Sequence, residues 1–177
     1  MRQWQVLTGA VLMMGLAGCE SIQNMADNLP GMSSAGTVDS APTVKRQVPF
    51  PVETYAALAK TGTATIKGRL AYQLTSGQTV YGNREKVSIA PATEYSAEAA
   101  DKALAGQRVE PADPRAQAYT HMTTTDANGY FTATGIPAGT FYVAGTVALP
   151  GGQGRSPFIL KQVRVKEGGS ANVTLRR

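Results

Sequence analysis

Residues 124–149 read TTDANGYFTATGIPAGTFYVAGTVAL, and this stretch decides the fold class because two turns separate runs in which apolar and polar residues alternate. Asp126 begins the first turn, where its carboxylate can accept backbone N–H groups, and Gly129 can supply the left-handed residue of a three-residue hairpin loop. A Pro-Ala-Gly segment makes the second turn. Over 140–149 the apolar residues then share one face, as in a half-buried strand.

The same alternation recurs on both sides of this stretch. It runs from Ala64 to Tyr72, marks a short strand at Val87 and Ile89 after a turn region over 77–83, and returns around the turn at 168–169. At least six short strands, most of them separated by turns, predict an antiparallel β-sandwich. The residues expected to form its core are Ile66, Leu70, Val87, Ile89, Phe131, Phe141, Val143 and Val147.

Residues 91–117 interrupt the strands with helix-forming sequence. The segment Ser96–Leu104 is rich in alanine. We expect Ser96 as the N-cap of a helix and Gly106 as its C-terminal stop. The sequence therefore predicts a short helical insertion within an all-β domain.

The amino-acid composition agrees with an all-β domain, and the net charge gives no indication of a nucleic-acid partner. Glycine and proline number 19 and 10, while aromatic residues make up only 7%, which suits a turn-rich β protein better than a helical bundle. The net charge of +5 is too mild to imply nucleic acid as a partner.

The two turns together resemble the signature of the carboxypeptidase regulatory-like domain. The segments 65–69 and 171–175 also match the first and last strands of that family. The resemblance implies an antiparallel sandwich of seven or eight strands, with transthyretin-like (prealbumin-like) topology, over residues 61–177. Such domains accompany many activities, so the expected function is a binding or scaffolding module without catalysis.

The N-terminus indicates where the chain works. A basic start is followed by an apolar run over 6–18 that is too short to span a bilayer, and Leu16-Ala17-Gly18-Cys19 resembles a bacterial lipobox. The resemblance implies a signal peptide over 1–18 and an acyl chain, such as palmitate, on Cys19, the only cysteine. By the same resemblance, Glu20 after the cysteine implies the outer membrane, because lipoproteins held at the inner membrane typically carry Asp there; the domain would lie in the periplasm or at the cell surface.

Residues 19–60 then form a lipid-anchored linker and a short lead-in. The part over 28–43 is polar and rich in turn-forming residues, so it cannot bury enough apolar surface to offset its ordering entropy. We expect a flexible spacer to about residue 50, followed by a turn or two of helix over Val52–Lys60.

The chain offers little for catalysis or for metal binding. His121 is the only histidine, and no nucleophile or triad spacing accompanies it. One histidine and an acylated cysteine do not make a metal site. The sequence therefore predicts no enzyme activity, no metal and no cofactor.

Two surfaces are candidates for binding. Tyr130 and Tyr142 fall on outward strand positions, with Tyr119 as a third candidate, and could stack on sugar rings or pack beneath the insertion. Lys67 and Arg69 point outward on the first strand. With other basic residues they could form one surface that binds anionic lipid or an acidic polymer. The alternative is a solvated sheet face whose charges keep edge strands from pairing with other chains. Those other basic residues are Arg164, Lys166, Arg176 and Arg177.

Two functions remain open at this point. The first is a scaffolding or binding module whose partner is an envelope protein, with the membrane reached through the lipid. The second is a carbohydrate-binding or peptidoglycan-binding module that uses exposed tyrosines on a polysaccharide partner.

Overall fold

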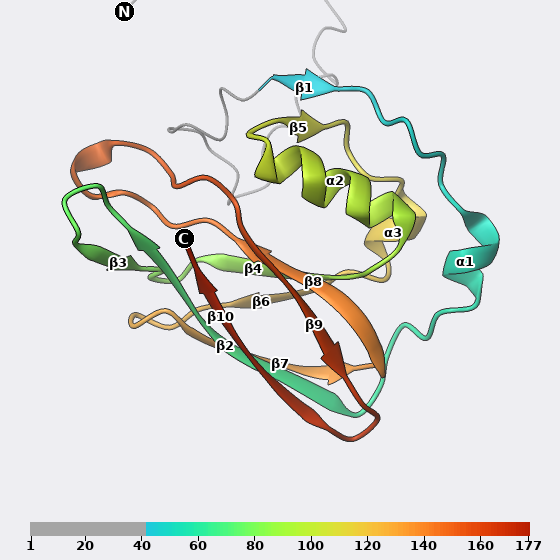
Figure 1. The fold of residues 1–177 in the computed structure, drawn as a ribbon. Helices are drawn as coiled ribbons and strands as arrows, with labels where there is room; N and C mark the ends of the chain where they lie inside the picture. The colour runs from blue at the N-terminus through green and yellow to red at the C-terminus, as the bar shows by residue number, and fades with distance from the viewer. Residues whose placement is uncertain (1–41) are drawn as a thin grey trace, which may run out of the picture. The chain divides into compact units, whose positions relative to one another are not determined.

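The computed structural model describes residues 42–177, so the predicted signal peptide, Cys19 and most of the predicted linker lie outside the described residues. The described part forms two four-stranded sheets that pack face to face (Figure 1). These eight strands confirm the predicted all-β sandwich and its strand number.

The first sheet consists of β2 (Ala64–Gln73), β3 (Thr79–Tyr81), β7 (Tyr130–Ile136) and β10 (Ser170–Arg176). The second sheet consists of β4 (Lys86–Pro91), β6 (His121–Thr124), β8 (Gly139–Gly145) and β9 (Ile159–Val165). The remaining elements are β1 (Thr43–Val44), α1 (Val52–Ala56), α2 (Glu94–Leu104), β5 (Arg108–Val109), α3 (Pro114–Gln117) and η1 (Pro150–Gly152).

Strand β2 organises the first sheet. It pairs with β10 along one edge, and with β7 and then β3 along the other edge. All the sandwich pairs are antiparallel, as predicted, except β2–β10, which is parallel. The register sets Arg69 between Thr174 and Tyr130, so these three side chains share one face of the sheet.

The core lies between the two sheets, and all eight residues predicted for it are buried there in one cluster. Each comes from a strand, or the continuation of one, in which apolar residues alternate with polar ones. The turn at 126–129 also forms as predicted. The Asp126 carboxylate accepts the N–H groups of Asn128 and Tyr130 at 2.8 and 2.9 Å, and Gly129 has φ +84°.

Two strand boundaries differ from the prediction. The strand expected over 140–149 ends at Gly145, because side chains rather than a neighbouring strand then accept the backbone N–H groups: Ser156 Oγ takes that of Val147 and Glu85 Oε1 that of Ala148, each at 2.9 Å. The region 77–83, expected as a turn, contains β3, because Val80 packs against the core.

The insertion carries α2 as predicted, with a correction at its start. The N-cap is Thr93 rather than Ser96; the two side chains form a capping box in which Ser96 stands at the third helical position. Gly106 follows the helix with φ +73°. The helix lies across the outer face of the second sheet (Figure 1), where it covers Ala90, Tyr142 and Ala144.

The ordered lead-in begins earlier than the predicted residue 50. β1 pairs with β5, and Arg46 donates hydrogen bonds to the carbonyls of Tyr95 and Glu110. A second small core of Tyr55, Tyr95 and Ala116 joins the lead-in to the insertion. The residues from Thr43 onward therefore belong to the ordered lead-in, because the insertion supplies backbone and aromatic partners for them. Over residues 42–177, no helix has the length and apolar character needed to cross a membrane.

Candidate functional site

The outward side of the first sheet forms a surface that we call the open face. Helix α2 covers the other sheet (Figure 1), and the side chains of the open face reach solvent. It consists of the outward residues of four strands: Lys67, Arg69, Tyr81, Tyr130, Thr132, Asn172, Thr174 and Arg176.

Arg69 lies between two exposed tyrosines at the centre of this face. Its guanidinium carbon is 3.7 Å from the centroid of the Tyr81 ring and 4.5 Å from that of the Tyr130 ring. Both rings stay accessible, with 41% of Tyr81 and 52% of Tyr130 exposed. The Nε group donates to the carbonyl of Asn128 at 2.9 Å. The contacts therefore hold the guanidinium in one orientation, which leaves less conformational entropy to lose on binding.

The structure brings together three of the four predicted ligand-binding residues. Lys67, Arg69 and Tyr130 all lie on the open face. Sequence reasoning missed Tyr81, which falls in the region expected as a turn. The only available signal was the alternation Thr79-Val80-Tyr81, and three residues are too few to establish a strand.

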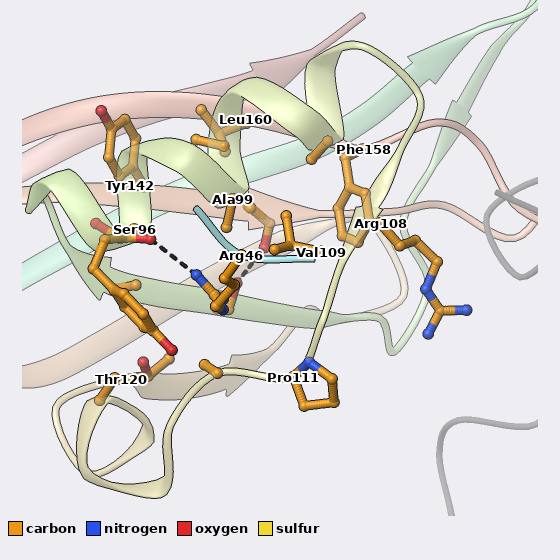
Figure 2. Close-up of a pocket in the computed structure, with 18 of the residues that line it drawn as sticks. Arg46, Ser96, Ala99, Arg108, Val109, Pro111, Thr120, Tyr142, Phe158 and Leu160 are labelled. Carbon is orange, nitrogen blue, oxygen red and sulfur yellow. Dashed lines mark hydrogen bonds between the residues drawn. The ribbon is translucent and has the colours of Figure 1, made fainter. Parts of the chain in front are cut away.

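Tyr142 does not join them. It lies on β8 in the second sheet, and its ring lines a cavity of about 320 Å³ between α2 and that sheet (Figure 2). Tyr142 thus takes the alternative position predicted for these tyrosines, beneath the insertion, because β7 and β8 belong to opposite sheets.

The predicted basic surface is also divided between the sheets. Arg176 shares the open face with Lys67 and Arg69, because β10 lies beside β2. Arg164 pairs with Thr140 on β8 and so belongs to the second sheet.

The α2 cavity exists because both of its walls carry small side chains. The helix contributes alanines, including Ala99 and Ala103, and the sheet opposite contributes Ala90 and Ala144. Its polar groups are largely engaged: Arg46, for example, bonds to backbone carbonyls and lies 4.0 Å from the Tyr95 ring centroid. In Figure 2 the guanidinium of Arg108 points away from the other labelled residues. The cavity is thus an apolar space with few hydrogen-bonding groups directed into it.

A hollow of about 420 Å³ lies beside α1 and α3. The positively charged side chains that line it already form cation–π contacts or an ion pair. Lys60 Nζ is 5.1 Å from the Tyr119 ring centroid, and the Arg115 guanidinium is 4.3 Å from that of Phe50. Arg115 also forms an ion pair with Asp113 at 2.8 Å. This pair holds the pKa of Asp113 down at about 2, because the side chain and backbone N–H of Arg115 donate to the carboxylate. On the open face, by contrast, the positively charged side chains have no acidic partner within residues 42–177.

His121 lies on β6 and does not line either the α2 cavity or the hollow beside α1 and α3. Burial lowers the pKa of its imidazole, partly offset by a hydrogen bond to the backbone of Lys60. Its Nε2 atom is buried without a hydrogen-bond partner. Within residues 42–177, no group of three or more His, Cys, Asp and Glu side chains could hold a metal ion.

Comparison with known proteins bears on the fold. No protein-family model matches this chain, and no curated protein does so either. A crystal structure of a proposed carbohydrate binding protein from Pseudomonas aeruginosa matches with a TM-score of 0.64 and 29% identity, over 73% of this chain and 99% of that chain. The two chains share a fold. This structural likeness supports the prediction that the chain is a binding module.

Two further solved structures match less well. A proposed carbohydrate binding protein from Bacteroides uniformis has a TM-score of 0.34 and 11% identity, over 65% of this chain and 41% of that chain. The dioxygenase domain of a dioxygenase carbohydrate-binding protein fusion from Streptomyces sp. SirexAA-E has a TM-score of 0.37 and 12% identity, over 85% and 94%. At TM-scores this low, neither likeness indicates a function for this chain.

Proposed function

We propose that this chain is a non-catalytic carbohydrate-binding module, and that the glycan lies on the open face. One observation carries the proposal: two exposed tyrosine rings flank a stacked arginine on a sheet face without a helix over it. An exposed ring offers an apolar surface to the C–H face of a sugar, and the surrounding side chains can hydrogen-bond its hydroxyls.

The likeness to the Pseudomonas aeruginosa protein supports this class of ligand, because that protein is itself a proposed carbohydrate binding protein and the match covers nearly all of its chain. The sheet also suits a polymer. Polar residues such as Thr132, Asn172 and Thr174 extend the face on both sides of the tyrosines, so an extended glycan could contact several strands.

The place of action proposed here is the outer membrane of a bacterial envelope. An acyl chain on Cys19 would hold the module there, and the residues between Cys19 and β1 would serve as its tether. The support is the sequence before Cys19 and its position as the only cysteine. A module held in this way has a polysaccharide or an envelope protein within reach.

Glycan binding by the full chain carrying Cys19→Ser tests the proposal. The ligands are a panel of peptidoglycan sacculi and soluble polysaccharides, and the measurement is isothermal titration calorimetry, with co-sedimentation for the insoluble ligands. We expect Tyr130→Ala and Tyr81→Ala each to abolish binding, because each removes one stacking surface. Their melting temperatures should stay close to that of the parent, since both side chains are exposed.

Tyr142→Ala is the matched control. It removes the same side chain from the outer face of the other sheet, so it should leave binding intact and affect stability alone. If no glycan in the panel binds, or if only Tyr142→Ala abolishes binding, the open face is not a carbohydrate site.

A further inference from the structure

The strands that build the open face are free of acidic residues. No Asp or Glu occurs in β2, β3, β7 or β10, whereas the insertion alone contains Glu94, Glu98, Asp101, Glu110 and Asp113. The acidic residues beside the open-face strands are engaged in turns. Asp126 accepts two backbone N–H groups of its own hairpin, and Glu167 accepts the hydroxyl of Thr63 at 2.6 Å.

Three cations occupy this acid-free surface at successive levels along β2. Lys67 and Arg69 are two residues apart, so their Cα atoms lie about 6.6–6.8 Å apart. Arg176 lies on the neighbouring strand beside Ala71, the next outward position along β2. The positive charges therefore follow the strand direction rather than gathering at one point.

The cations have no acidic partner among residues 42–177. The side chain of Lys67 forms no hydrogen bond or ion pair there, and the Arg176 guanidinium donates to the neutral amide of Gln73 at 3.1 Å. Arg69 uses only its Nε group, toward the Asn128 carbonyl. Its terminal nitrogens, the pair that suits a carboxylate or phosphate oxygen, have no partner in the described part of the chain.

We infer that the open face binds an anionic polysaccharide, whose carboxylate or phosphate groups pair with Arg69, Lys67 and Arg176 while its sugar rings lie against Tyr81 and Tyr130. The inference rests on the proposed function and specifies its ligand class by charge complementarity. A neutral glycan would leave three adjacent cations uncompensated. A line of anionic groups along a linear polymer would meet them in succession.

Polygalacturonate and its methyl ester distinguish the two kinds of glycan, because they share a backbone and differ in charge. The test is to compare their binding to the full chain carrying Cys19→Ser by isothermal titration calorimetry. We expect the acid form to bind about ten-fold more tightly or better, since charge-assisted hydrogen bonds are stronger than neutral ones. The difference should shrink as sodium chloride is raised, because salt screens exposed charges.

Charge-removing variants locate the site. Arg69→Gln and Lys67→Gln should each weaken polygalacturonate binding about ten-fold. The exposed Lys67 side chain has no hydrogen bond or ion pair to lose within residues 42–177, so its variant stays informative even if Arg69→Gln disturbs the two tyrosines. Arg164→Gln, which removes an exposed positive charge from the second sheet, is the control and should change the affinity less than about two-fold.

The outcomes separate the inference from the proposed function. Equal binding of the acid and its methyl ester, or preference for neutral glycans in the panel, overturns the anionic ligand and leaves a carbohydrate-binding module. Absence of binding to every glycan overturns both. Binding to phosphatidylglycerol vesicles that depends on Lys67 and Arg69, without binding to polygalacturonate, shows a membrane surface instead and also overturns the inference.

Discussion

Phe141 shows at the scale of one residue what alternation in a strand achieves. The ring lies between the sheets with 3% of its surface exposed, among Ile66, Ile89 and the other core residues. Phe141→Ala removes this buried ring and leaves a cavity, so it should lower the free energy of unfolding by about 3–5 kcal/mol.

Urea unfolding followed by circular dichroism measures this change. Tyr130→Ala is the comparison, because it removes a similar ring from the surface and should change the free energy of unfolding by about 0.5 kcal/mol or less. Equal losses in the two variants would contradict the position of Phe141 in the core.

His121 gives a pH dependence of stability. Burial lowers the pKa of the folded imidazole below its usual value of about 6.5, so just below that pH the unfolded chain binds more protons than the folded one. Stability therefore rises with pH in this range, and it is lost as the pH falls from about 6.5 toward the lowered pKa of the folded state.

The midpoint of urea unfolding at pH 7, 6 and 5 measures the effect. His121→Gln should flatten the profile, because glutamine does not titrate. Asp113 does not interfere, since the lowering of its pKa to about 2 affects stability only at more acidic pH. An unchanged slope in the variant would show that other groups cause the dependence.

At the scale of elements, α2 covers the second sheet and leaves the first sheet to bind. Ala99 faces the cavity between helix and sheet, whereas Ala97 is not among the residues that line it. Ala99→Leu should fill part of this space, and polysaccharide binding should be unchanged, because the proposed site lies on the opposite sheet.

Calorimetric titration of Ala99→Leu beside Ala97→Leu checks this expectation. The second variant adds the same side chain to the same helix outside the cavity. Loss of binding in Ala99→Leu alone would move the ligand site from the open face to the α2 cavity.

At the scale of the whole molecule, the lead-in belongs with the insertion rather than with the linker. Arg46 bonds to Tyr95 and Glu110, and Gln47 N–H donates to the carboxylate of Glu98 at 2.6 Å. The segment before β2 is thus attached to the second sheet through α2, which leaves the open face unobstructed by the lead-in.

Acylation of Cys19 predicts where the whole molecule is found in a bacterial cell. The full chain should fractionate with the outer membrane, and Cys19→Ser should appear in the soluble fraction, because removal of the acyl chain removes the anchor. Fractionation of cells that express the two forms, followed by immunoblotting, measures the distribution. An unchanged membrane share in the variant would exclude the lipid as the anchor.

The sequence by itself determined the local structure of the sandwich. Alternation identified the core residues, and the Asp126 and Gly129 turn formed as expected, because strand faces and tight turns depend on neighbours a few residues apart. The helical insertion was also predicted from the sequence. Its N-cap is Thr93 rather than the predicted Ser96, because both side chains take part in the capping box.

Only the tertiary structure decided which outward residues meet. β2 and β10 are adjacent although about a hundred residues separate them, so Arg176 joins Lys67 and Arg69, while Arg164 and Tyr142 belong to the other sheet. A period of two tells which side chains leave the core, but both sheets have an outer face and the period is the same for each. Strand pairing assigns the face, and with it the candidate site of Tyr81, Arg69 and Tyr130.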